Sequence, residues 1–513
     1  MAFRRSQWVG TGVVGAVAVA TVVAITLALQ PAGSAATGLS AAPLGVNVAP
    51  WDGVYAGAAA AAVQPKLAAA GIKELRYGGG SYADIYNWQT NVNVGACQQF
   101  GASASGATGS GCTAQDPLGF AEFSRQARAI DAQSLVTVNY GSGTPAQAAA
   151  WVSRAAQTAG ENVALWEVGN ETYGCWETND KLAGPPEYYQ GYRQSVNGDP
   201  NNASCPQTAQ GEVNGMKTLA NSYAVNAEQF LKAMKAADPS AVLGVPWAFG
   251  PEVGGSEVAD AAAWNETVLR ADGPYIGFVD AHYYPFTFSG ATGGANPTDS
   301  QVLHALQKIP SLQSSIDKEL ASRDPNATDV IGETAVSNST TTTVCTPVGA
   351  VFAAGDVLSW LAAGAQSVDW WSLHDTANTG ASCASPGSGL FSAAGQPTAE
   401  TPYYGYLLAS RLAQPAAELK FLTTSDPADV LAYQSWRPDG KHAVAFVNLN
   451  PGAAANVTFP AVPGLDGTLN YWSYSAGAQN ATRSNVETGS TPAASVATHI
   501  RLPPESVTVL QTQ

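Results

Sequence analysis

The sequence predicts a (β/α)8 barrel followed by a C-terminal β-sandwich. Near-continuous apolar runs recur eight times before residue 401, and Ala-rich helical stretches separate them. Runs of this kind are typical of parallel strands that helices cover on both faces. Eight such units in about 350 residues fit a single barrel with enlarged loops. From residue 401 the pattern changes to short alternating strands broken by Pro, Gly and Asn, which is typical of a β-sandwich.

Each expected element can be placed in the chain. The barrel strands are expected at 45–51, 72–80, 134–141, 162–171, 241–247, 278–286, 329–335 and 367–375. The clearest sandwich strands are expected at 430–436, 442–450, 468–475 and 505–511. We therefore expect a signal peptide at 1–36, a catalytic barrel at 37–400 and an accessory β-sandwich at 401–513.

The N-terminal segment resembles an export signal. Two arginines in MAFRRSQW precede a long run of apolar and small residues, and the small residues of PAGSAATG follow. This order predicts cleavage near Ala35 or Ala36 and a secreted, extracellular protein with no membrane association after cleavage. The run from Val9 to Leu29 is also long enough to span a bilayer, so a retained membrane anchor is the alternative.

Composition limits the partners and cofactors. The net charge is −16, with 39 acidic and 23 basic side chains, so the chain lacks the basic surface that a nucleic acid requires. No phosphate-binding loop, haem motif or metal-ligand spacing occurs. We expect chemistry without a cofactor or a metal ion, and the oligomeric state is left open.

Six cysteines suit an exported protein with three disulfides. Their order suggests the pairs Cys97 with Cys112, Cys175 with Cys205, and Cys345 with Cys383, although other pairings are possible. A metal site is the rival interpretation, and the absence of a CxxC or Cys/His cluster disfavours it.

Two glutamates end apolar runs in equivalent ways. Glu171 ends the fourth expected strand, in WEVGNE, and Glu333 ends the seventh, in VIGET. The C-terminal ends of barrel strands carry the active site, so both carboxylates are expected there, on opposing sides of one cleft. A facing pair of carboxyl groups suits glycoside hydrolysis, which needs a proton donor and a nucleophile or base. Taken singly, each glutamate could instead be solvated or ion-paired.

The same residues carry a family resemblance. WEVGNE and the strand-seven glutamate resemble the clan A glycoside hydrolases, which are retaining (β/α)8 enzymes. LRYGGGSYADIYNW, at 75–88, is similar to the strand-two motif of glycoside hydrolase family 51, the α-L-arabinofuranosidases. Gly78 stands where that family usually has proline, and the loop after strand two is longer and carries cysteines.

The resemblance implies roles for individual residues. It makes Glu171 the acid/base, Glu333 the nucleophile and Asn170 a partner of the sugar 2-hydroxyl. Arg76 would keep the nucleophile ionised, with a structural salt bridge as the alternative role.

On strand six, alternation leaves two pairs that could face the interior, and the resemblance favours His282 with Tyr284. Trp371 matches the strand-eight tryptophan of the clan, which is often joined to the next residue by a cis peptide, and would be a sugar platform. An ordinary core tryptophan is the alternative.

Further aromatic residues near the strand ends are candidate sugar subsites, because sugar C–H faces stack on rings. They are Trp176, Tyr173, Tyr86, Trp88 and Trp247. Together these features predict a retaining glycosidase acting on a polysaccharide or oligosaccharide, foremost an α-L-arabinofuranosidase. The alternatives are a β-xylosidase, a β-glucuronidase, an endoglycanase or a carbohydrate-binding protein without turnover.

Overall fold

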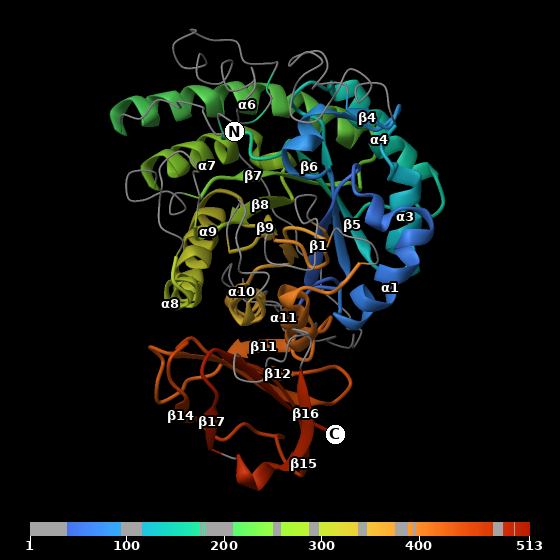
Figure 1. Cartoon of the computed structure of the whole chain (residues 1–513). Coiled ribbons are helices and arrows are strands. Elements are labelled where there is room, and N and C mark those ends of the chain that lie inside the picture. Colours follow the sequence, from blue (N-terminus) through green and yellow to red (C-terminus); the bar gives the residue numbers. More distant parts are fainter. Residues whose placement is uncertain are drawn as a thin grey trace, which may run out of the picture. The chain divides into compact units, whose positions relative to one another are not determined.

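Eight parallel strands close into a barrel in the computed structural model, in the order β1-β10-β9-β8-β7-β6-β5-β2 (Figure 1). Their bounds are Leu44–Val48 (β1), Glu74–Tyr77 (β2), Gln133–Val138 (β5), Leu165–Val168 (β6), Val242–Trp247 (β7), Phe278–Tyr283 (β8), Thr328–Thr334 (β9) and Val368–Trp370 (β10). All eight predicted barrel strands are therefore confirmed. The structure describes residues 38–93, 115–174, 177, 179, 209–249, 258–286, 297–336, 346–374, 388–392, 397–475, 486–496 and 498–513.

Helices surround the barrel (Figure 1). They are α1 (Ala60–Ala69), α3 (Phe120–Ala129), α4 (Pro145–Gln157), α6 (Ala209–Ala237), α7 (Val258–Asp272), α8 (Asp299–His304), α9 (Ile309–Arg323), α10 (Pro347–Ala363) and α11 (Thr401–Ala409). Short 3-10 helices lie at Gly53–Tyr55, Gly57–Ala59, Gly80–Ile85 (η3), Gly273–Tyr275, Ala305–Lys308 and Ala493–Ser495, and β3 (Tyr86–Asn87) pairs with β4 (Val92–Asn93).

Helix α4 shows how the sequence specifies such a helix. Thr144 and Gln147 form a capping box at its start, and Pro145 occupies the first turn, where no N–H bond is lost. Its buried residues are Ala148, Trp151, Val152 and Ala155. This spacing of three and four residues puts them on one face, which packs on the barrel.

The C-terminal part is a β-sandwich with its own apolar core. Six antiparallel strands lie in the order β11-β12-β13-β18-β15-β16, and a second sheet pairs β14 with β17. Their bounds are Glu418–Phe421 (β11), Val430–Trp436 (β12), His442–Asn448 (β13), Ala455–Thr458 (β14), Thr468–Ser475 (β15), Glu487–Pro492 (β16), His499–Leu502 (β17) and Ser506–Thr512 (β18). Phe446 and Phe459 lie in this core with their ring centroids 4.9 Å apart. The predicted sandwich and its four clearest strands are confirmed.

The residues that directly follow position 401 were expected to begin the strands, and that detail is wrong. Thr401–Ala409 is a helix, and the first sandwich strand begins at Glu418. The helix forms because its aromatic residues are buried on the barrel side, where the Tyr406 hydroxyl donates to the Val368 carbonyl (3.3 Å). The domain boundary between 400 and 401 remains a prediction.

Several predictions fall outside the described residues. These are the signal peptide at 1–36 and all six cysteines, so their pairing remains a prediction. Within the described ranges, no helix has the length and apolar character needed to cross a bilayer.

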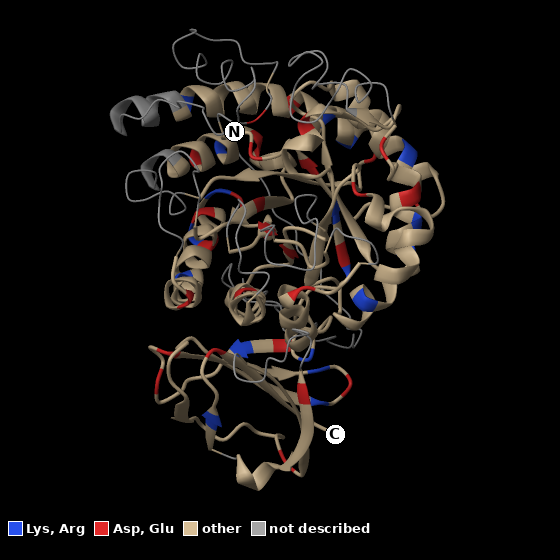
Figure 2. Cartoon of the chain, in the orientation of Figure 1, with Lys and Arg blue, Asp and Glu red and all other residues tan. Residues whose placement is uncertain are grey.

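Acidic residues occur on the barrel strands as well as on the outer helices (Figure 2). Arg76 is the only lysine or arginine that is buried in the described part of the chain, whereas several carboxylates are buried with it. This imbalance in the barrel interior marks the candidate site.

Candidate active site

The two predicted catalytic glutamates meet at the C-terminal end of the barrel. Glu171 lies just after β6 and Glu333 near the end of β9. One oxygen of each carboxylate and a ring nitrogen of His282 all lie within 4.8 Å of one another. Glu333 is 4% exposed, whereas Glu171 is only half-buried. One carboxylate is therefore enclosed, and the other is more accessible to solvent.

A sharp turn presents Glu171 to the cleft. Gly169 has φ of 81°, and a Cβ at this position would lie 2.6 Å from the Thr172 methyl carbon, so a larger residue would not fit. Glu171 itself has φ of 43°, an unfavourable backbone conformation for a residue with a side chain. Asp84 holds this turn by accepting from the Asn170 backbone N–H (3.0 Å). Strain at this position is consistent with a functional site.

Arg76 connects the residues of the site. Its guanidinium donates to Glu333 (2.7 Å), Glu167 (2.9 Å) and Asp280 (3.1 Å). It also donates to the amide oxygens of Asn47 and Asn170, both at 2.9 Å. Burial disfavours the charged form, but these carboxylates outweigh it and raise the pKa of Arg76. Arg76 is thus a permanent cation in contact with the candidate nucleophile.

Glu333 is held by two donors on its two oxygens. Arg76 Nη1 donates to Oε1, and the Tyr284 hydroxyl donates to Oε2 at 2.6 Å. Burial raises the pKa of Glu333, and Glu171 adds to this, while His282 and Arg76 act in the opposite direction. The carboxylate is therefore fixed in orientation and poorly solvated, which suits a nucleophile.

His282 lies between the two glutamates. Its Nδ1 donates to Glu171 Oε1 (2.8 Å) and lies 3.5 Å from Glu333 Oε2. Burial would lower the pKa of His282, but Glu333, Asp280 and Glu171 outweigh it, so the pKa lies well above its ordinary value. The raised pKa favours the imidazolium form of this ring, whose Nε2 lies 3.2 Å from Arg76 Nη2.

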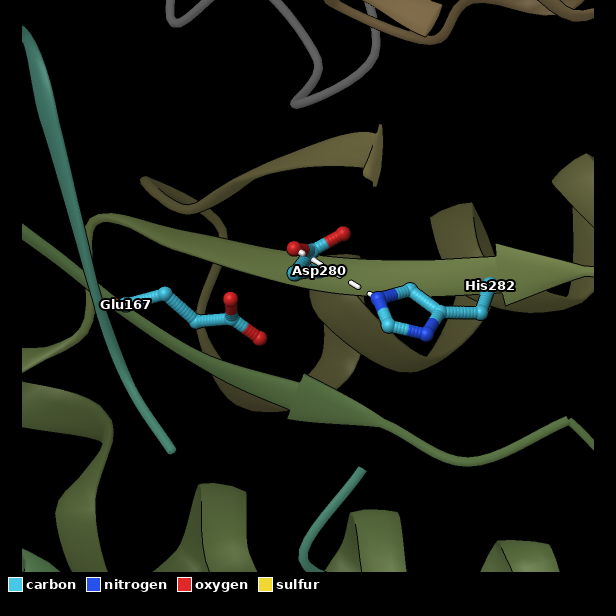
Figure 3. Close-up of side chains that lie close together, drawn as sticks. All are labelled: Glu167, Asp280 and His282. Carbon is cyan, nitrogen blue, oxygen red and sulfur yellow. Dashed lines mark ion pairs between the residues drawn. The ribbon is translucent and has the colours of Figure 1, made fainter. Parts of the chain in front are cut away.

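Asp280 and Glu167 lie beside His282 in the barrel, and Asp280 is paired with the ring (Figure 3). Asp280 Oδ2 is 3.8 Å from His282 Nε2, and its Oδ1 accepts from the Gly332 N–H (2.7 Å), one residue before Glu333. A Cβ on Gly332 would lie 2.1 Å from Asp280, so only glycine permits this contact. Burial would raise the pKa of Asp280, but Arg76 and His282 lower it below its usual value. Asp280 therefore links the cation to the strand that carries Glu333, the candidate nucleophile.

Two groups of side chains also have the spacing of metal ligands, Glu167 with Asp280 and His282, and Glu171 with His282 and Glu333. Arg76 contacts a carboxylate in each group. A divalent ion would lie beside this fixed positive charge, which is unfavourable. The residues do not fit a metal centre, and chemistry without a metal ion remains our prediction.

Trp371 follows β10 and is half-buried, and its peptide bond to Ser372 is cis. Its ring lies against the glycine turn after β2, where a Cβ on Gly80 would be 2.8 Å from the indole and 3.5 Å from Glu333. The indole and Glu333 therefore both lie beside Gly80, which puts the ring in a place suited to a sugar platform.

The other predicted aromatic residues differ in placement. Tyr86 and Trp247 are buried in the core, and Trp88 stacks on Trp151 at 5.3 Å. Tyr86 and Trp247 are therefore core residues, and Trp88 is half-buried with one face against Trp151. The Tyr173 hydroxyl donates to Glu171 Oε1 (3.3 Å), and Trp176 lies outside the described residues.

Four acidic residues of the site were not predicted: Asp84, Glu167, Glu177 and Asp280. The alternation that puts His282 and Tyr284 on one face of the strand also puts Asp280 on that face, so the sequence could have predicted this residue. Glu167 is a charge inside an apolar run and lies two residues before the glycine turn. Asp84 lies in the short 3-10 helix η3 and Glu177 on a loop, and no periodicity points to either residue.

The chain is similar in fold to solved glycoside hydrolases. The α-L-arabinofuranosidase from Thermotoga maritima is 15% identical with a TM-score of 0.63, and the match covers 94% of this chain and 98% of that one. The GH51 α-L-arabinofuranosidase from Thermotoga petrophila has a TM-score of 0.66 at 15% identity, with 93% and 98% covered. A family 44 xyloglucanase from Paenibacillus polymyxa has a TM-score of 0.55 at 12% identity, with 92% and 96% covered.

The sequence itself matches no protein-family model and no curated protein. The similarity to the solved structures confirms the resemblance to clan A and family 51 at the level of the fold. The fold is a barrel with a C-terminal β-sandwich, and its strand ends carry two facing carboxylates.

Proposed function

We propose that this protein is a secreted glycoside hydrolase that retains anomeric configuration, with Glu333 as nucleophile and Glu171 as acid/base. The observation that carries the proposal is the pair of carboxylates with oxygens within 4.8 Å of each other. Retaining glycosidases hold their two carboxyl groups about 5 to 5.5 Å apart, whereas inverting enzymes need a wider gap for water.

The contacts of each glutamate support the division of roles. In the first step Glu333 attacks the anomeric carbon, and Glu171 transfers its proton to the departing glycosidic oxygen. Glu333 suits attack because Arg76 and Tyr284 fix its two oxygens. In the second step water attacks the glycosyl ester and gives a proton to Glu171, and Glu333 leaves as a carboxylate.

His282 supports both steps. Negative charge moves from Glu333 to Glu171 when the ester forms, and it returns when the ester is hydrolysed. The His282 Nδ1 is 2.8 Å from Glu171 and 3.5 Å from Glu333, so its positive charge compensates either carboxylate. A group that is positioned in advance of the charge movement stabilises the transition state without reorganisation.

For the substrate we propose α-L-arabinofuranosides. The strand-two sequence LRYGGGSYADIYNW and the similarity to two solved α-L-arabinofuranosidases support this choice. The similarity to a xyloglucanase supports a second candidate, an endoglycanase. The two differ in the substrate they turn over and not in the roles of the glutamates.

The test is hydrolysis of a panel of aryl glycosides, headed by 4-nitrophenyl α-L-arabinofuranoside, by wild type and by Glu333→Ala. We expect turnover by wild type and a loss of at least about 10⁴-fold in the variant. Turnover of another sugar would keep the mechanism and change the substrate. Binding without turnover in both proteins, on the panel and on polysaccharides, would indicate a carbohydrate-binding protein instead.

A further inference from the structure

A third carboxyl group lies beside the catalytic pair. Glu177, on the loop after β6, is 1% exposed, although it is an acidic residue in a loop. Its Oε1 accepts from the Asn170 amide nitrogen (3.1 Å) and from the Ser81 hydroxyl (2.6 Å). Its Oε2 is buried and has no hydrogen-bond partner among the described residues. Neither the sequence motifs nor the proposed mechanism accounts for this residue.

The contact with Asn170 fixes the orientation of its amide. Asn170 Nδ2 donates to Glu177, and Asn170 Oδ1 accepts from Arg76 at 2.9 Å. An amide turned by 180° would place oxygen against oxygen at Glu177 and nitrogen against the guanidinium at Arg76. Asn170 directly precedes Glu171, so its orientation belongs to the geometry of the acid/base turn.

We propose that Glu177 is a positioning residue for the reaction, which holds the Asn170 amide against Arg76 and acts as a neutral carboxylic acid. The proposal rests on the proposed function, because Asn170 matters to turnover only in a working glycosidase. Glu177 itself touches neither the anomeric carbon nor the glycosidic oxygen in this assignment.

The neutral form follows from the surroundings of the carboxyl group. The charged groups that face it are Asp84 and Glu171, both acidic, and Oε2 has no donor within the described ranges. Burial, followed by these two carboxylates, raises the pKa of Glu177 well above its ordinary value. With Oε1 accepting two hydrogen bonds, the proton belongs on Oε2. A neutral Glu177 also adds no negative charge beside Glu171.

The experiment compares Glu177→Gln with Glu177→Ala on the best aryl glycoside. Glutamine keeps an acceptor for Asn170 and Ser81, so we expect kcat/KM within about threefold of wild type. Alanine leaves the Asn170 amide without its partner, and we expect kcat/KM to fall about 10- to 100-fold, mainly in kcat. A Glu177→Gln variant as impaired as Glu177→Ala would overturn the proposal.

Two further readouts separate positioning from a general loss of structure. In a double-mutant cycle, Glu177→Ala should cost little once Asn170 is already alanine, whereas independent losses that multiply would contradict the proposal. The pH profile of kcat/KM should coincide for wild type and Glu177→Gln. If Glu177 were a carboxylate, its removal would lower the pKa of Glu171 and shift the basic limb toward lower pH.

A stability measurement tests the proposal without activity and so separates it from the proposed function. Because the folded-state pKa of Glu177 is raised, its ionisation opposes folding, and stability is lost as pH rises above its unfolded value. Glutamine does not titrate, so the Tm of Glu177→Gln should increase relative to the Tm of wild type as the pH rises from about 5 to 8. A Tm difference that stays constant over this range would contradict a neutral Glu177, whether or not any glycoside is hydrolysed.

Discussion

Two acidic clusters in the barrel interior show how one type of side chain can behave in opposite ways. The upper cluster lies at the C-terminal end, where Arg76 contacts Glu167, Asp280 and Glu333. The lower cluster lies deeper, where Glu74 and Asp369 face each other. The lower pair has no cation in contact among the described residues.

The pKa of Asp280 follows this difference, whereas the pKa values of Glu167 and Glu333 in the upper cluster are raised. In the upper cluster Arg76 and His282 overcome burial and hold the pKa of Asp280 below its ordinary value. In the lower cluster burial raises the pKa of Glu74 to about 7 and that of Asp369 well above its ordinary value. Ser367 donates to Glu74 (2.6 Å). The cations therefore hold Asp280 charged, whereas burial and the neighbouring Asp280 raise the pKa of Glu167 to about 8 despite its contact with Arg76.

Glycines make room for both clusters. A Cβ on Gly45 would lie 1.6 Å from the Asp369 carboxylate, and a Cβ on Gly332 would lie 2.1 Å from Asp280. Neither cluster could form if these strand positions carried side chains.

The largest expected effect comes from removing the cation. Arg76→Met removes the cation that three buried carboxylates share, and we expect a loss of about 3 to 5 kcal/mol in the free energy of unfolding, together with a loss of activity. Urea unfolding measures the loss. The control is Arg154→Met, whose side chain is 43% exposed in its pair with Glu161 and should cost less than about 1 kcal/mol. Equal stability of the two variants would show that the upper cluster does not depend on its cation.

A smaller effect is expected when the positive charge of His282 is removed and Arg76 is kept. His282→Asn keeps Arg76 but loses the positive charge between Glu171 and Glu333, and we expect kcat/KM to fall about 100-fold. His304→Asn is the control. His304 lies at the end of the outer helix α8, pairs with Asp429, and its side chain is 33% exposed. Steady-state kinetics that leave both variants close to wild type would remove His282 from the mechanism.

The smallest expected effect concerns the lower cluster and pH. Raised folded-state pKa values give stability that is complete below the unfolded values and is lost as pH rises toward the folded ones. For Glu74 this window runs from its ordinary 4.5 to about 7. Asp369→Asn removes one acid and offers a donor to Glu74, so we expect the fall in stability across this window to shrink by about 1 kcal/mol.

Tm measured at several pH values for wild type and Asp369→Asn tests this expectation. Glu266→Gln, in a surface ion pair, is the matched control and should follow wild type. A parallel decline in all three proteins would mean that the lower pair is not the source of the pH dependence.

The sequence predicts the barrel well and the charge network poorly, for physical reasons. Buried parallel strands require continuous apolar runs, and these are local features that can be read directly. The ends of such runs also reveal Glu171 and Glu333. The contacts of Arg76 are different, because its partners Glu167, Asp280 and Glu333 lie 91, 204 and 257 residues away.

Which carboxylates share a cation therefore follows from strand order and register. Helix α11 was missed for a related reason. Its apolar residues are buried by packing on the barrel, and this packing is a tertiary contact that the local sequence pattern does not reveal.

The central claim is the division of roles between Glu171 and Glu333, and azide rescue tests it most directly. An aryl glycoside with a good leaving group would be supplied with azide to Glu171→Ala and to Glu333→Ala, and the anomeric configuration of the glycosyl azide read by NMR. The account predicts retained configuration from Glu171→Ala, because azide attacks the ester on Glu333, and inverted configuration from Glu333→Ala, because azide attacks the substrate directly. The reverse pattern, or inversion in both variants, would contradict it.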